Sequence, residues 1–203
     1  MKLRPVCLVL RVKADLKGHI CLVCIPSNLA RDDFSCVKKY NRLHNANPKK
    51  IPIASSDYSQ LFQAPSTTST VTNDKGYIIE AQDVIYVSVR MNAGGGAQAG
   101  ALVSKGENAL GKNFRIGTYD NKGSPGSNYL NFFSVMATED QTTINLRSNN
   151  ITGLVIQNYS GQFPIENITL NRGESYTVAV KVTDANGNRD GLIGALVNAD
   201  KNV

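Results

Sequence analysis

The sequence predicts an all-β fold built from repeated, antiparallel four-stranded units. Three observations lead to this prediction. Stretches rich in β-branched and aromatic residues recur along the chain, turn-forming Asn, Gly, Ser and Thr are abundant between them, and no amphipathic helical period is found after residue 50. With 203 residues and 41% hydrophobic content, the chain can bury a core by packing alone.

Charge divides the chain near residue 50. Residues 1–50 contain 11 Lys or Arg and 3 Asp or Glu, whereas residues 51–203 contain 11 and 13. We therefore predict an irregular basic leader over 1–50, poorly ordered or not native to the module, and a repeat-built β module over 51–203. The near-neutral module has no electrostatic footprint for nucleic acid. No segment reaches the roughly 20 apolar residues of a membrane-spanning helix.

Individual strands are predicted from residue type and alternation. The run Ile20–Ile25 is apolar and is compatible with a strand or a buried turn. Val84–Met91 is rich in β-branched residues, and Gly100–Val103 follows it as a short return strand. Each lies next to turn-forming residues.

Further strands are expected in the second half of the module. Asn131–Ala137 is a mostly apolar strand, and Thr142–Leu146 alternates and is a candidate partner for it. Tyr176–Val182 alternates with period 2, which predicts one face toward a core.

The repeat hypothesis depends on three pairs of similar segments within the module. They are Tyr86–Arg90 with Tyr176–Lys181, Gly100–Val103 with Gly194–Val197, and Ala64–Val71 with Ala137–Ile144. Four antiparallel strands in each copy predict a partial β-propeller, with a β-sandwich as the alternative. Two units are fewer than the roughly four blades that close a propeller. We therefore expect the chain to be a fragment of a longer protein.

Four runs carry a resemblance to a known family: Gly100–Gly106, Ala109–Gly117, Phe133–Asp140 and Asp190–Val197. They resemble the N-terminal module of the IgGFc-binding-protein family over roughly residues 55–203. The resemblance implies an extracellular, repeat-rich β module inside a longer chain. Its bacterial versions occur in large surface or secreted proteins, including gliding-motility-associated proteins of Bacteroidetes type. It implies no catalytic motif and no agreed ligand, and residues 1–50 depart from it.

Catalytic patterns are weak, and we predict that the protein is not an enzyme. A Ser/His/Asp or Cys/His arrangement needs an imidazole as the base, and both histidines, His19 and His44, lie in the leader. Carboxylate pairs of the glycosidase kind are formally possible among the acids of the module. Those acids lie mainly in turns, where solvated acids also belong.

Two groups of residues in the sequence could bind a metal. Cys21, Cys24, Cys36 and His44 are four possible zinc ligands, but their spacing and apolar surroundings are a poor match. The sharper candidate is a calcium loop, in which oxygen ligands recur at every second position. Its candidate ligands are Asp184, Asn186, Asn188 and Asp190. The same residue types also form an ordinary hairpin turn, so a cofactor is not required.

Function is predicted as non-catalytic binding or adhesion at the cell surface or outside the cell, by a gliding-motility or cell-envelope protein. The partner is an unidentified protein or glycan. The recognition surface is expected on three loops, Asn92–Gln98, Asp120–Asn128 and Asp184–Asp190. The alternatives are a structural spacer without a ligand and a polysaccharide-active enzyme.

Overall fold

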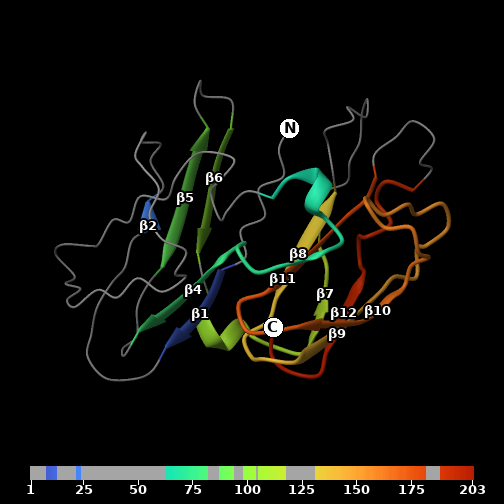
Figure 1. The fold of residues 1–203 in the computed structure, drawn as a ribbon. Coiled ribbons are helices and arrows are strands. Elements are labelled where there is room, and N and C mark those ends of the chain that lie inside the picture. The colour runs from blue at the N-terminus through green and yellow to red at the C-terminus, as the bar shows by residue number, and fades with distance from the viewer. Residues whose placement is uncertain are drawn as a thin grey trace. The chain divides into compact units, whose positions relative to one another are not determined.

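The computed structural model describes residues 8–12, 22–23, 63–81, 87–93, 98–103, 105–117, 131–181 and 188–203 (Figure 1). Strands make up nearly all of their regular structure. The helices in this part of the chain are two short 3-10 helices, η1 (Pro65–Thr67) and η3 (Gly106–Ala109). The all-β prediction is therefore confirmed for the described residues.

The chain divides into two compact units. Among the described residues, unit 1 contains 63–76, 110–117, 131–181 and 188–203, and unit 2 contains the rest. The first sheet of unit 1 is antiparallel, with four strands in the order β10-β9-β12-β7. These are β7 (Asn113–Arg115), β9 (Thr142–Arg147), β10 (Ile165–Leu170) and β12 (Leu196–Ala199).

The second sheet of unit 1 has three antiparallel strands in the order β3-β11-β8. These are β3 (Val71–Thr72), β8 (Phe132–Met136) and β11 (Ser175–Ala179). The strands predicted over Asn131–Ala137 and Thr142–Leu146 are thus present as β8 and β9, and part of the one predicted over Tyr176–Val182 is β11.

One hydrophobic core lies in unit 1 and takes side chains from both sheets. Ile144 and Leu146 of β9 are almost completely buried in it, as are Leu170 of β10 and Val178 of β11. The two antiparallel sheets of unit 1 thus bury a common core, which is compatible with the β-sandwich that the sequence predicted as the alternative to a propeller.

Unit 2 contains a parallel pair and a mixed sheet. Strand β1 (Leu8–Val12) runs parallel to β4 (Tyr77–Ala81). Strand β2 (Leu22–Val23) runs parallel to β5 (Ser88–Ala93), which pairs antiparallel with β6 (Gln98–Val103). The first 50 residues, predicted as irregular, therefore contribute two strands. The predicted boundary at residue 51 lies outside the described residues.

The prediction that the two copies fold as equivalent four-stranded units is wrong for the described strands. In the first copy β5 and β6 are neighbours, whereas in the second copy β11 and β12 belong to different sheets. The turn before β12 explains the difference, because Gly194 donates its N–H to Ile116 O and Ile116 donates to Ala195 O. These bonds bring β12 to β7, so consecutive strands do not form a propeller blade.

The predicted pairing of Asn131–Ala137 with Thr142–Leu146 is also wrong. Strand β8 pairs with β11, and β9 pairs with β10 and β12. The turn between β8 and β9, with Gln141 at a φ of 53°, carries the chain from one sheet to the other. Apolar composition predicted the first strand and alternation the second, but neither could assign their neighbours.

Candidate functional site

Strand β11 carries polar side chains on the face opposite the core. Because side chains alternate along a strand, Tyr176 and Val178 enter the core while Ser175 and Thr177 face the other way. Antiparallel sheets often leave that second face to water. Here every residue of β11 is buried, so other parts of the chain cover its polar face.

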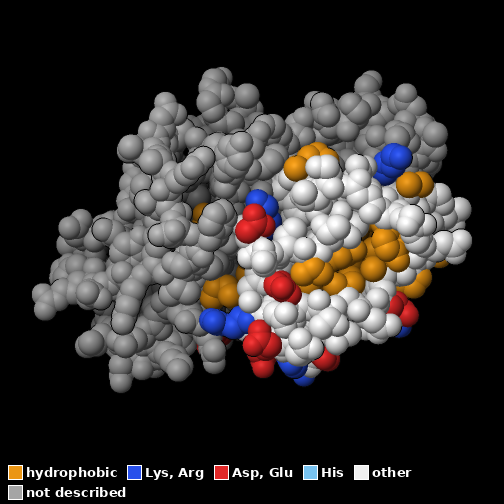
Figure 2. Space-filling view, viewed as in Figure 1, with side chains coloured by type: hydrophobic (Ala, Val, Ile, Leu, Met, Phe, Trp, Pro, Cys, Tyr) orange, Lys and Arg blue, Asp and Glu red, His pale blue; other side chains and the backbone are white. Residues whose placement is uncertain are grey.

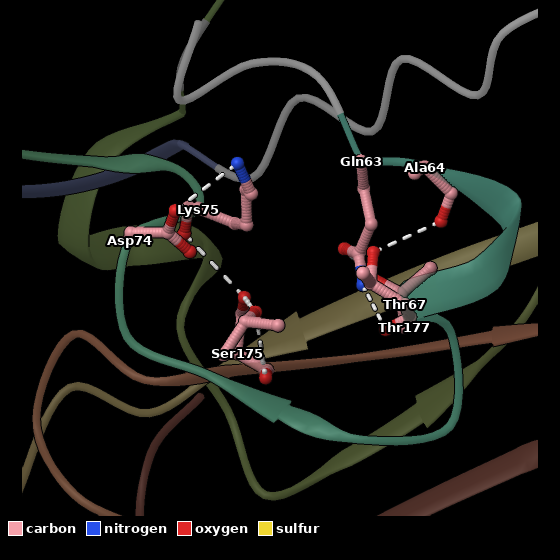
Figure 3. Close-up of polar contacts among 8 residues, drawn as sticks. Gln63, Ala64, Thr67, Asp74, Lys75, Ser175 and Thr177 are labelled. Atoms are coloured by element: carbon pink, nitrogen blue, oxygen red, sulfur yellow. Dashed lines mark hydrogen bonds and ion pairs between the residues drawn. The ribbon is translucent and has the colours of Figure 1, made fainter. Parts of the chain in front are cut away.

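A buried glutamine covers the middle of this face. Gln63 and Thr177 are both completely buried. Thr177 Oγ1 donates a 2.7 Å hydrogen bond to Gln63 Oε1 and lies 3.0 Å from Ser134 Oγ (Figure 3). Gln63 Nε2 donates to Thr67 O at 2.8 Å. Because these buried groups have partners, the network stabilises the docking of residues 63–67.

A second group of polar contacts lies at the start of β11. Thr72 Oγ1 and Ser175 Oγ are 3.0 Å apart, and Ser175 Oγ donates to Lys75 O at 3.4 Å. The adjacent Asp74 and Lys75 form an ion pair of 3.2 Å (Figure 3). These contacts attach residues 72–75 to a strand about one hundred positions later in the sequence.

Two segments share one edge of β11. Ser69 donates its backbone N–H to Thr177 O, and Gln157 donates its N–H to Ala179 O, both at 2.8 Å. Ile156 forms a β-bridge with Val180. The chain around residue 156 therefore continues along the edge where β3 stops.

Side chains also tie these two segments directly to each other. Ser69 Oγ donates to Gln157 O at 2.7 Å. Asn158 Nδ2 donates to Pro65 O at 2.6 Å and to Thr68 Oγ1 at 3.1 Å. Ser69 and Asn158 have φ of 59° and 56°, a conformation that ordinary residues adopt only where their surroundings impose it. We refer to residues 63–73 and 154–164 as the paired loops.

The phenol of Tyr176 lies beneath the paired loops. Burial raises the pKa of Tyr176, a hydrogen bond with the Ser69 side chain lowers it, and the nearby Tyr159 raises it, with burial the largest effect. The raised pKa keeps the phenol protonated at neutral pH. Tyr176 therefore remains a neutral hydrogen-bonding partner of Ser69.

The hydroxyl groups of this region lack the surroundings of a nucleophile. An activated serine or threonine needs an adjacent base such as histidine, and the described part of the chain contains no histidine or cysteine. Thr177, Ser175 and Ser69 instead bond to backbone or amide oxygens or to other hydroxyls. What this arrangement can do chemically is hold two loops rigidly and present their outer surface.

The predicted calcium loop is only partly described. Asp184 and Asn186 lie outside the described residues. Asn188 Nδ2 donates to Asn150 O at 2.8 Å, and Asp190 Oδ1 accepts a 3.4 Å hydrogen bond from the buried Asn131. No group of three or more His, Cys, Asp or Glu that could hold a metal occurs among the described side chains. The calcium site remains a prediction.

The three predicted recognition loops also lie largely outside the described residues. Asp120–Asn128 lies outside the described residues, as do residues 94–97 and 184–187. The described ends of Asn92–Gln98 belong to β5 and β6. Cys21, Cys24, Cys36 and His44, which were a poor match to a zinc site in the sequence, also lie outside the described residues.

The paired loops were not predicted as a site. The sequence contained one usable signal, because residues 63–73 and 154–164 include no charged side chain and are rich in Ser, Thr, Asn and Gln. Figure 2 shows how white, uncharged surface and hydrophobic side chains dominate one face of the described residues, with charged groups scattered around them. A run of hydroxyl residues has no period, so it predicts a loop but not its partner.

Comparison with known proteins identifies one family. The family model described as IgGFc binding protein matches residues 99–203, which is just over half of the chain. Comparison with curated proteins and with solved structures finds no match. Among the helices in the described ranges, none has the length and apolar character needed to cross a membrane.

Proposed function

We propose that this chain, which belongs to the IgGFc-binding protein family, is a non-catalytic extracellular module that binds a protein or a glycan. The observation that carries the proposal is the family match over residues 99–203, because the matching family is described as an IgGFc binding protein. The match runs from within β6 to the end of the chain and includes all described strands of unit 1 except β3.

Two features of the described residues support binding over catalysis. The hydroxyls on the polar face of β11 are engaged in structural hydrogen bonds. The loops beside them are cross-tied, and loops on a rigid β scaffold are the usual place for recognition. The slight excess of acidic residues after residue 50 favours partners other than nucleic acid.

A narrower form of the proposal places the module in a cell-envelope or gliding-motility protein. The cell-envelope or gliding-motility context rests on the resemblance of four sequence runs, and labelling of intact cells with an antibody against residues 51–203 tests the surface location. Absence of label on intact cells, with label on lysed cells, would exclude it.

Calcium binding is the second narrower prediction. If Asp184, Asn186, Asn188 and Asp190 bind calcium, a calcium concentration 100 times the Kd stabilises the fold by about 2.7 kcal/mol. The measurement is Tm with calcium and with a chelator, for the native chain and for Asp184→Asn. An identical Tm in all four samples excludes the site.

Binding itself is tested by exposing the full chain to arrays of glycans and of extracellular proteins. The proposal predicts reproducible, saturable binding to members of at least one array, and loss of that binding after heat denaturation. A folded chain that leaves both arrays blank would instead identify a structural spacer.

A further inference from the structure

We infer that the paired loops form a recognition surface for an uncharged oligosaccharide, an inference that rests on the proposed binding function. The surface is defined by residues 63–73 and 154–164, which share the edge of β11. Its exposed polar side chains are amides and hydroxyls: Ser66, Thr67, Thr70, Asn73, Asn158, Ser160 and Gln162. Three of them, Thr67, Thr70 and Asn158, also donate hydrogen bonds within the loops. Such groups both donate and accept hydrogen bonds, as the hydroxyls of a sugar do.

The electrostatics of the surface favour a neutral ligand. Neither loop contains a charged side chain. The charges that flank them are paired, Asp74 with Lys75 at 3.2 Å and Glu166 with Arg147 at 2.7 Å. Lys181 contacts the loops through its backbone, because its N–H donates a hydrogen bond to Val155 O. Anionic ligands need clustered cations, and these loops do not supply them.

An aromatic side chain lies within the polar surface. Tyr159 is half-buried and packs against the core. Its phenol lies over Gly161, where an added Cβ would come within 2.6 Å of the Tyr159 ring and hydroxyl. Tyrosine provides a rigid amphipathic contact at low entropic cost, and Ser, Gly and Asn provide adaptable hydrogen bonds beside it. Because Gly161 has no side chain, the Tyr159 ring can occupy this position.

The exposed aliphatic residues of the loops favour a sugar over a protein partner. Val71 and Val155 are about equally exposed, at 45% and 44%. Val71 is opposite Tyr176, on the core side of the sheet. Val155 precedes Ile156, which bridges Val180 on the core side, so Val155 faces the other way. They do not form the contiguous apolar centre that protein interfaces have.

The loops are ordered before any ligand arrives. The ties from Ser69 to Gln157 and from Asn158 to Pro65 fix their relative position. A surface that is already ordered loses less conformational entropy on binding. Weak individual contacts with sugar hydroxyls can then give measurable affinity.

The test applies the full chain to an array with neutral, sialylated and sulfated glycans and to an extracellular protein array. Titration of the best neutral glycan then compares the native chain with Gly161→Ala, Tyr159→Ala and the control Thr169→Ala, whose side chain is exposed on β10. Gly161→Ala displaces only the end of the Tyr159 side chain, so it tests the ring position in a protein that keeps its fold.

We expect binding to neutral glycans, a loss of affinity of about tenfold or more for Gly161→Ala and Tyr159→Ala, and native affinity for Thr169→Ala. A neutral glycan that binds both variants as tightly as the native chain overturns the inference and leaves the proposed function intact. Exclusive binding to anionic glycans or to proteins has the same consequence. Blank arrays contradict both proposals.

Discussion

The two sheets of unit 1 differ in how far the face opposite the core is buried. In β10 the residues Ile165, Ile168 and Leu170 are buried, and the three residues between them are exposed. In β11 all five residues are buried, including Ser175 and Thr177 on the polar face. Gln63 meets that face through its hydrogen bond with Thr177. Residues 69–72 instead lie along the edge of β11, where Thr72 also bonds to Ser175.

The contrast shows that a buried polar face can be built from hydroxyl residues when a distant segment satisfies them. Apolar residues on that face would be easier to bury, but they would give the covering segment no fixed position. The hydrogen bonds place residues 63–73 in one register against β11. The same register brings Ser69 next to Gln157 and so creates the paired loops.

The largest effect is expected in the core that both sheets share. Leu146→Ala on β9 removes a side chain that is 1% exposed and lowers the free energy of unfolding by about 2–5 kcal/mol. Thr169→Ala on the exposed side of β10 changes it by less than about 1 kcal/mol. Urea denaturation measures both, and equal losses would contradict the assignment of the two faces.

The next effect distinguishes the polar face of β11 from the outer side of β9. Thr177→Val keeps the shape of the side chain but leaves the buried Gln63 Oε1 without its donor. We expect a loss of about 1–3 kcal/mol in the free energy of unfolding. Thr143→Val, at a partly exposed position of β9, should change it by no more than about 0.5 kcal/mol. A stabilised Thr177→Val protein would refute the network.

A smaller effect is expected at high pH. Because burial raises the pKa of Tyr176, the folded chain holds this proton at a pH where the unfolded chain has lost it. Ionisation of Tyr176 has no effect on stability below the usual tyrosine pKa of about 10, and it lowers stability increasingly as the pH rises above that value. Between pH 8 and pH 11 the Tm of the native chain should therefore fall more steeply with pH than the Tm of Tyr176→Phe. Parallel curves would show that the phenol is not buried.

The smallest effect is expected at the exposed ion pair between Arg147 and Glu166. Both side chains are well exposed, at 58% and 42%, so solvent screens their attraction. Glu166→Gln should lower the free energy of unfolding by less than about 0.5 kcal/mol, with little further change at high salt. A loss above about 1 kcal/mol, measured by urea denaturation, would require an additional partner for this carboxylate.

Strand positions could be predicted from the sequence because residue composition and alternation are local properties. Asn131–Ala137 and Thr142–Leu146 correspond closely to β8 and β9. Strand neighbours could not be predicted, because alternation states which residues share a face and leaves open which strand lies alongside. Gly100–Val103 and Gly194–Val197 are alike in sequence, but the first lies wholly within β6 and the second begins in the turn before β12.

The candidate site was less predictable than the strands. Gln63 and Thr177 are 114 positions apart, and no local pattern connects a single glutamine to one threonine among many. The uncharged composition of residues 63–73 was visible in the sequence. Its meaning depends on the tie between Asn158 and Pro65, which only the fold reveals.

The most direct test of the account is a double-mutant cycle between Gln63 and Thr177, because the docking of residues 63–73 on β11 creates the proposed surface. Gln63→Ala, Thr177→Val and the double variant are compared by urea denaturation. A coupling energy of about 0.5–3 kcal/mol is predicted for two side chains in one buried network. Additive losses, with a coupling energy near zero, would mean that the two residues do not meet and would contradict the paired loops.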